Sequence, residues 1–160
     1  MKIALREARP VDYGFARQLY RTTMRDRIEA AFGWDEYRQD MSFAQQFVLR
    51  EVRVITLGGK DIGWIQTRAE GPVLNLFQFY IAPEFQNRGI GTLVLKRLMT
   101  EAKRRGKVIA LSVMKGSPVI RFYQRHGFRL THADAYKIYM RQEIKLPLRG
   151  MGPSMGMRRG

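Results

Sequence analysis

The sequence predicts a single α/β domain in which helices flank a mixed central sheet. Three observations lead to this prediction: apolar segments that suit strands, segments of helical period between them, and a strand–helix–strand unit in mid-chain. The predicted element order is β-α-α-β-β-β-α-β-α-β-β. A chain of 160 residues is long enough for one core. We expect the domain to span residues 1–146 and a flexible tail rich in Gly, Met and Arg to follow at 147–160.

The first half of the chain is expected to begin with a strand, two helices and a hairpin. Pro10 and Asp12 open the first helical pattern, and Gly33 interrupts it. The period then changes to that of strands, and Gly58-Gly59 supplies a tight turn. The expected elements are a strand over 2–8, a helix from about 12 to 32, a helix over 35–49, and strands over 52–57 and 62–68.

The second half is expected to contain the strand–helix–strand unit, a short helix and a last hairpin. Its first strand is apolar on both faces, as a central strand should be. Ser117 and Pro118 suit an N-cap followed by the first helical position. The expected elements are a strand over 73–81, a helix over 89–105, a strand over 107–113, a helix over 118–126, and strands over 128–131 and 136–144.

Composition limits the possible functions. The chain has no Cys, which excludes disulfides, thiolate metal sites and cysteine nucleophiles. It has no apolar stretch of signal or membrane-spanning length, so we expect a soluble, unprocessed, cytoplasmic protein that binds no membrane. The net charge is +15, and it is uneven: residues 86–160 hold 17 basic and 3 acidic residues. We therefore expect an anionic ligand to contact the C-terminal half.

A glycine-containing turn joins the strand over 73–81 to the next helix. Gly89 and Gly91 at the helix start let a bound group approach the backbone, and unpaired N–H groups there favour an anion. Alternatively, these glycines only permit a tight turn and close helix packing. The third glycine of the dinucleotide fingerprint is missing, and no Gly-Lys-Ser or Gly-Lys-Thr of a P-loop follows.

A second pattern lies about 35 residues further on, where Phe122-Tyr123 precedes Gly127-Phe128 by three residues. Taken with Gln86-x-x-Gly89-x-Gly91, it resembles the GNAT superfamily of N-acetyltransferases. The resemblance covers residues 2–144 in element order, and its diagnostic residues lie within 73–128. It implies the GNAT fold, acetyl-CoA as co-substrate, and no metal.

The resemblance also implies roles for particular residues. Tyr123 would protonate the departing thiolate of CoA, and we favour this role over the alternative that it is an aromatic residue packed in the core. The turn would bind the diphosphate, and the preceding strand end would bind the pantetheine arm. The cofactor-binding residues implied are Phe79, Tyr80, Ile81, Gln86, Asn87, Arg88, Gly89, Ile90, Gly91 and Thr92. Two departures from the family pattern are Gly116, where many relatives carry Asn, and the lack of a carboxylate on strands 73–81 and 107–113. No general base is therefore named.

The acceptor is expected to be an amine-bearing small molecule or peptide, and family precedent allows a homodimer. Without Cys, the acetyl group would pass directly within a ternary complex. Exposed Glu29, Asp35 or Glu36 could hold a cationic amine, but we favour N-cap and solvated helix charges, with Trp34 in the core.

The two histidines, His126 and His132, have no paired spacing that would indicate a metal site. An alternative function is a nucleic-acid-directed protein, either an acetyltransferase of charged tRNA or a binding module without catalysis. No basic stripe interleaved with aromatic residues is visible, so we favour the cofactor as the anion.

Overall fold

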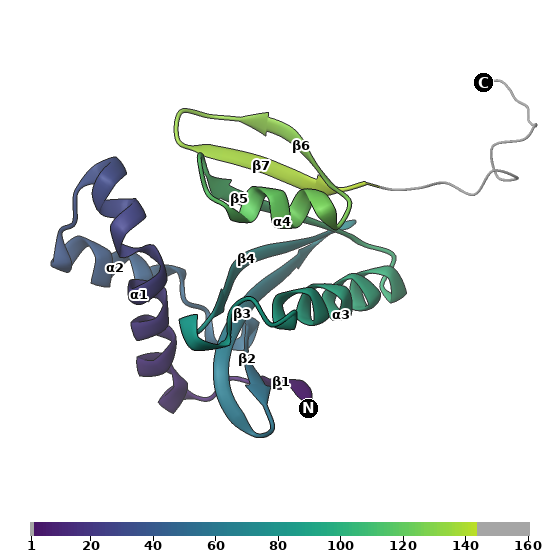
Figure 1. Ribbon diagram of the computed structural model, residues 1–160, viewed down its shortest axis with the longest axis horizontal. Helices are drawn as coiled ribbons and strands as arrows, with labels where there is room; N and C mark the ends of the chain where they lie inside the picture. The colour runs from purple at the N-terminus through teal and green to yellow at the C-terminus, as the bar shows by residue number, and fades with distance from the viewer. Residues whose placement is uncertain (1, 144–160) are drawn as a thin grey trace, which may run out of the picture. The chain divides into compact units, whose positions relative to one another are not determined.

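The computed structural model describes residues 2–143 (Figure 1). The predicted tail at 147–160 lies outside the described residues. Two compact units make up the chain, one that ends at Ile109 and one that begins at Ala110. Among the described helices, the longest has 20 residues, and neither it nor any other has the composition of a membrane span.

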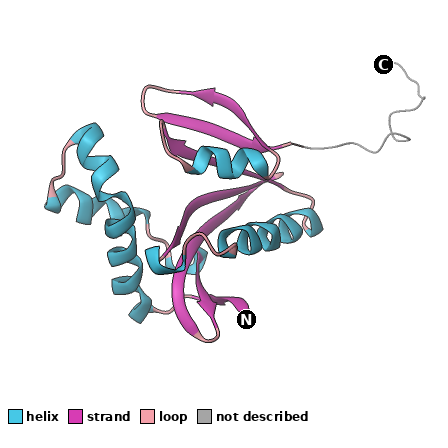
Figure 2. Cartoon of the chain, viewed as in Figure 1, coloured by secondary structure: helices cyan, strands magenta, loops and turns pink. Residues whose placement is uncertain are grey.

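The first unit is a four-stranded antiparallel sheet with helices on its faces (Figure 2). The strands follow the chain in the order β1-β2-β3-β4. The elements are β1 (Ile3–Glu7), α1 (Tyr13–Phe32), α2 (Glu36–Gln46), β2 (Val52–Leu57), β3 (Lys60–Glu70), β4 (Val73–Ile81) and α3 (Ile90–Arg104).

One face of this sheet carries an aromatic core under α1 and α2. Trp64 of β3 is almost fully buried there, and it packs against Phe43 of α2 together with Leu19 of α1. Side chains alternate between the two faces of a strand. Arg53 of β2 therefore points to the opposite face, where its guanidinium meets the carboxylate of Glu101 on α3 at 2.9 Å. The helices thus cover opposite faces of one sheet.

The second unit contains α4 (Val119–Arg125), β6 (Phe128–Ala133), β7 (Lys137–Gln142) and all but the first two residues of β5 (Val108–Met114). Its strands are antiparallel in the order β5-β7-β6. Asp134 closes the last hairpin, because its carboxylate accepts hydrogen bonds from the backbone N–H groups of Tyr136 and Lys137 at 2.9 and 2.7 Å. Gly127, at φ +87°, ends α4 and allows Phe128 to start β6.

The predicted fold class and element order are confirmed. Several element boundaries differ from the expected ones, and the largest difference is at α2, which ends at Gln46 rather than continuing to about residue 49. Phe47 leaves the helical conformation, and its ring packs edge-on against Tyr13 and Trp64. This tertiary contact outweighs the local helical pattern, which continues past the true end.

Candidate active site

The turn before α3 has an unusual backbone. Asn87 has φ +62° and is the one non-glycine residue with positive φ among residues 2–143. Gly89, at φ +80°, is the N-cap of α3. Left-handed conformations at two nearly adjacent positions fold the chain into a tight concave bend. The sequence predicted the turn from its glycines, and Asn87 is a second residue type that tolerates this conformation.

The beginning of α3 offers unused hydrogen-bond donors. No carbonyl in the described part of the chain accepts from the backbone N–H groups of residues 89–92. Gly89 supplies no capping side chain, and the first turn of α3 contains no acidic residue. Ile90 is buried, so at this position only the backbone can serve a ligand. Such a helix start attracts an anion, because free N–H groups and the helix dipole both favour negative charge.

Two cations flank the turn. Arg88 lies with its guanidinium 5.2 Å from the ring centre of Phe85, and the ammonium of Lys60 lies 5.1 Å from the same ring. Lys60 comes from the start of β3, more than twenty residues earlier in the sequence. The sequence indicated Arg88 but not Lys60, because nothing in the local pattern of a hairpin turn indicates a distant aromatic partner. Both charges add to the positive potential of the turn.

The end of β4 is held firmly in place. The side-chain amide of Gln86 donates a hydrogen bond to the carbonyl of Ile81 at 2.8 Å, so the turn is tied to the strand that precedes it. A Cβ on Gly63 of β3 would overlap the carbonyl oxygen of Tyr80, and this close approach explains the glycine. The register of β3 and β4 skips Phe77, which forms a β-bulge just before the strand end.

The predicted pantetheine residues Phe79, Tyr80 and Ile81 are the last three of β4, and all are half-buried. The Tyr80 ring packs against Trp64 and Tyr20 in the aromatic core. Its side chain therefore serves the fold, and a ligand along this strand would be recognised through the main chain.

Tyr123, the predicted catalytic residue, lies on α4 in the second unit. Only 6% of its surface is exposed, and its ring makes edge contacts with Phe122 and Phe128. Burial raises the pKa of the Tyr123 phenol above its usual value of 10, because the charged phenolate would lose its hydration. The hydroxyl is therefore protonated at neutral pH. This state suits a proton donor, and it equally suits an aromatic core residue.

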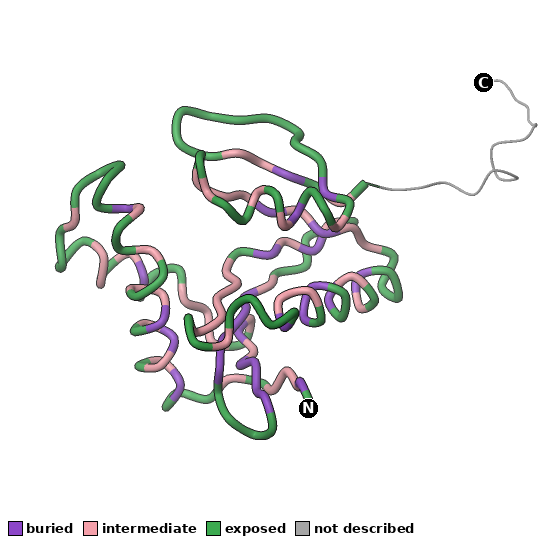
Figure 3. The backbone as a smooth tube through the Cα atoms, in the orientation of Figure 1, coloured by how far each residue is buried: buried purple, intermediate pink, exposed green. Residues whose placement is uncertain are grey.

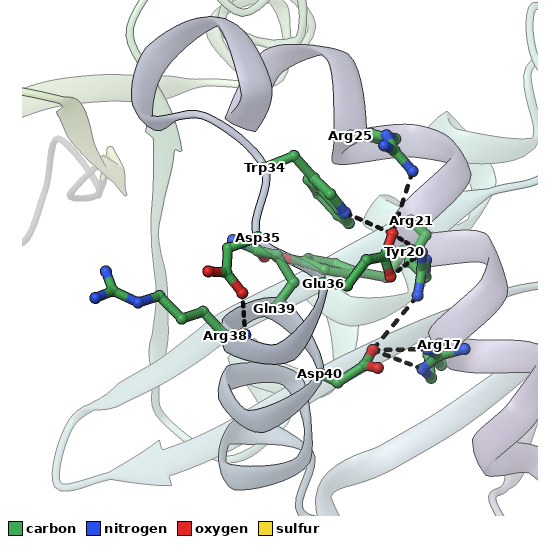
Figure 4. A network of polar contacts seen from close by, with 10 residues as sticks. All are labelled: Arg17, Tyr20, Arg21, Arg25, Trp34, Asp35, Glu36, Arg38, Gln39 and Asp40. Atoms are coloured by element: carbon green, nitrogen blue, oxygen red, sulfur yellow. Dashed lines mark hydrogen bonds and ion pairs between the residues drawn. The ribbon is translucent and has the colours of Figure 1, made fainter.

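The acidic residues between α1 and α2 are already paired within the chain (Figure 4). Glu36 accepts hydrogen bonds from Arg21 at 2.5 Å and from the indole N–H of Trp34 at 2.9 Å. Hydrogen bonds from Arg21 and then Trp34 lower the pKa of the Glu36 carboxyl. Arg25 approaches the same carboxylate at 3.4 Å. Glu36 is thus a centre of helix–helix pairing.

The prediction that Trp34 lies in the core was wrong. Trp34 is only partly buried, and the guanidinium groups of Arg21 and Arg25 lie 5.6 and 5.0 Å from its ring centre. Its indole N–H has a polar partner on Glu36, so the residue can remain at the surface between charged neighbours. Trp34 lies between α1 and α2, and its two cationic partners come from α1, about ten residues earlier in the sequence, where the helical pattern gave no sign of them.

The remaining polar candidates have structural partners. Asp35 is the N-cap of α2 and accepts from the backbone N–H of Arg38 at 3.0 Å, as the N-cap interpretation predicts. Glu29 pairs with Arg25 at 3.7 Å. The ring of His132 stacks on Tyr139, with centroids 4.2 Å apart. Within residues 2–143, no group of His, Asp and Glu side chains could hold a metal ion.

A buried ion pair that the sequence did not indicate lies near the start of α1. Asp12 is 5% exposed and receives two hydrogen bonds of 2.9 Å from Arg6, plus one of 2.7 Å from the backbone N–H of Arg9. Arg6 also contacts Asp61 at 3.1 Å. These bonds, with the Arg6 guanidinium foremost, lower the pKa of Asp12 to about 2. The sequence indicated Asp12 only as the opening of a helix.

Comparison with known families gives one match that covers most of the chain. The model of the acetyltransferase (GNAT) family matches residues 14–128. Among curated proteins, an uncharacterised N-acetyltransferase of Methanocaldococcus jannaschii is 33% identical over 70 residues. That match spans 42% of this chain and 31% of the relative, so the chain covers about a third of the relative's length.

Solved structures share the fold. The PaiA N-acetyltransferase of Thermoplasma acidophilum, in complex with coenzyme A, superimposes with a TM-score of 0.72 at 19% identity, over 90% of this chain and 100% of that one. An acetyltransferase of Thermus thermophilus gives 0.69 at 16% identity, over 89% and 97% of the two chains. At these identities the likeness establishes the fold.

Proposed function

Since the chain belongs to the acetyltransferase (GNAT) family, we propose that it transfers an acetyl group from acetyl-CoA to a primary amine. The amine attacks the thioester directly, within a ternary complex of enzyme, acetyl-CoA and acceptor. The acceptor is an amine-bearing small molecule or a peptide.

The observation that carries the proposal is the backbone of the turn from Gln86 to Thr92. Positive φ at Asn87 and Gly89, and the free N–H groups of residues 89–92, fit the diphosphate of CoA. Arg88 and Lys60 add charge at the same place. The related fold of the PaiA N-acetyltransferase, which binds coenzyme A, supports this assignment.

The chemistry requires two proton movements. The nitrogen lone pair of the amine forms the new N–C bond, the C–S bond breaks, and its electron pair goes to the sulfur of CoA. An amine with a pKa of about 10.4 is roughly one part in a thousand neutral near pH 7, so it must lose a proton before attack. We assign no residue as the base, because neither β4 nor β5 carries a carboxylate or an imidazole.

We assign the second proton movement to Tyr123, which protonates the thiolate as it leaves. Its raised pKa keeps the phenol protonated until a basic thiolate forms. General acid catalysis of this kind contributes rate without contributing to CoA affinity.

The proposal is tested by thiol release from acetyl-CoA in the presence of amino acids, polyamines, aminoglycosides, peptides and tRNA. With an accepted amine in hand, Tyr123→Phe keeps the ring and removes the proton donor. We expect turnover to fall by about 10- to 1,000-fold, while CoA affinity measured by calorimetry is retained. Phe122→Leu serves as the control for aromatic packing on the same helix. Unchanged turnover in Tyr123→Phe would mean that Tyr123 only packs, and failure to bind acetyl-CoA would overturn the function itself.

A further inference from the structure

The outer face of α3 is basic and exposed. The helix buries Ile90, Val94, Leu95, Leu98 and Ala102 against the unit, and buried and exposed positions alternate along it (Figure 3). The exposed positions include Lys96, Arg97, Lys103 and Arg104. Lys96, Arg97 and Arg104, with Thr100 and Glu101, line a hollow of about 440 Å³ along the helix. We call the surface formed by Lys96, Arg97, Lys103 and Arg104 the α3 basic face.

The charges of the α3 basic face are not neutralised within the unit. None of its four cations forms an ion pair with a carboxylate among residues 2–143. The one acidic residue of the helix, Glu101, is already held by both guanidinium nitrogens of Arg53, at 2.9 and 3.0 Å. Four positive charges clustered without counter-ions repel one another, so an external anion relieves this cost.

The turn before α3 is too far away for one cofactor to use all of these charges. An α-helix rises about 1.5 Å per residue, so Lys103 and Arg104 lie about 20 Å along the axis from the helix start at Ile90. A CoA diphosphate at that start leaves the far end of the face unoccupied. The ligand of the α3 basic face is therefore a second anion, and an extended one.

We propose that the α3 basic face is a docking surface for the phosphodiester backbone of a nucleic acid. Such a backbone presents regularly spaced negative charges along its length, which matches cations spread over just over two turns of one helix. A membrane surface fits less well, because helices that bind lipid insert large apolar side chains. The apolar face of α3 is buried in the unit, and among the described residues of this helix Leu93 is the one large apolar side chain that is exposed.

The test compares two triple variants of the full chain that remove the same charge. Lys96→Gln, Arg97→Gln and Arg104→Gln remove it from the α3 basic face. The matched control, Lys2→Gln, Arg38→Gln and Arg50→Gln, also removes one Lys and two Arg, from exposed positions elsewhere in the first unit. Binding of short fluorescent RNA and DNA duplexes is measured by anisotropy over a salt series, with and without saturating acetyl-CoA. Vesicles of phosphatidylglycerol and phosphatidylcholine serve as the lipid probe.

We expect the α3 triple variant to bind the preferred duplex at least about 10-fold more weakly, and its log–log salt slope to fall by up to about 3, since three phosphate contacts are lost. The control triple should change affinity by less than about threefold. Comparison of the two duplexes identifies RNA or DNA as the source of the backbone.

Several results would overturn the proposal: equal losses in both variants, no binding by the wild type, displacement of the duplex by acetyl-CoA, or binding to vesicles alone. Acetyl-CoA affinity is measured separately for every variant by calorimetry, so a failure of the proposed acetyl transfer is distinguished from a failure of this docking surface.

Discussion

Helices α1 and α3 lie on opposite faces of one sheet and are both rich in basic residues, but they differ in whether these residues form ion pairs. Arg17, Arg21 and Arg25 of α1 each contact a carboxylate of α2, at 2.7, 2.5 and 3.4 Å. The cations of the α3 basic face have no such contact within residues 2–143. The charges of α1 hold two helices together, whereas those of α3 are available to a ligand. Net charge alone therefore does not indicate which cations bind a partner.

The helix N-termini differ in the same way. The start of α2 is capped by its own carboxylate, because Asp35 accepts from the backbone N–H of Arg38. The start of α3 has Gly89 instead, with no side chain to accept from its N–H groups. A helix start that satisfies its own donors has little need of an external anion, and one that does not is suited to bind one.

The largest expected effect comes from adding a side chain at the uncapped helix start. Gly91 is the second residue of α3, and a Val there should crowd a bound diphosphate and force the backbone to shift. We expect Gly91→Val to weaken acetyl-CoA binding about 100-fold, or about 2.7 kcal/mol, in calorimetry.

Gly14 provides the matched control, because it is the second residue of α1 and a Cβ there meets nothing within 4 Å. Gly14→Val should leave acetyl-CoA affinity intact, and thermal unfolding should show both variants folded. Wild-type affinity in Gly91→Val would move the diphosphate away from this turn.

The sequence predicts those features of the molecule that local chemistry determines. The element order follows from hydrophobic period, and the turn before α3 follows from Gly89 and Gly91, whose conformational freedom is a property of the residues themselves. The end of α2 could not be predicted, because Phe47 leaves the helix for aromatic partners that the fold supplies.

Pairings across the fold could not be predicted at all. Lys60 reaches Phe85 beside the turn, Arg53 holds Glu101 on another element, and Arg21 holds Glu36. The partners of each pair are fifteen to nearly fifty residues apart, so a local sequence pattern does not contain both of them. The contrast between neutralised and free cations depends on these pairings, and only the structure provides it.

A second, smaller effect is expected at Asp12, the most buried of the side chains that form ion pairs. Asp12→Asn should lower the free energy of unfolding by about 2 kcal/mol near neutral pH, because the pKa of Asp12 is lowered to about 2 from its usual value of 3.8. A depressed pKa means that the ionised carboxyl stabilises the fold above about pH 4, and that this contribution is lost as the pH falls towards 2.

Urea unfolding across this pH range should therefore show the difference between wild type and Asp12→Asn shrinking with acid. Asp61→Asn is the control, since Asp61 shares Arg6 but its side chain is 39% exposed, and we expect a smaller loss. A difference that is independent of pH would show that the Arg6 ion pair is not its source.

The smallest expected effect comes from a substitution of Arg21, which tests whether a cation in an ion pair contributes to ligand binding. The side chain of Arg21 is 19% exposed, and it joins Glu36, Asp40 and the Trp34 ring. Arg21→Gln should lower the free energy of unfolding by about 1 kcal/mol, the upper range for a partly exposed ion pair, while Arg38→Gln, on the exposed surface of α2, should change it by less than about 0.5 kcal/mol. Neither variant should alter acetyl-CoA or duplex affinity by more than about threefold, although both remove one positive charge. A loss of duplex binding in Arg21→Gln as large as that of the α3 triple variant would show that paired and unpaired cations serve the same ligand, and the distinction between α1 and α3 would then fail.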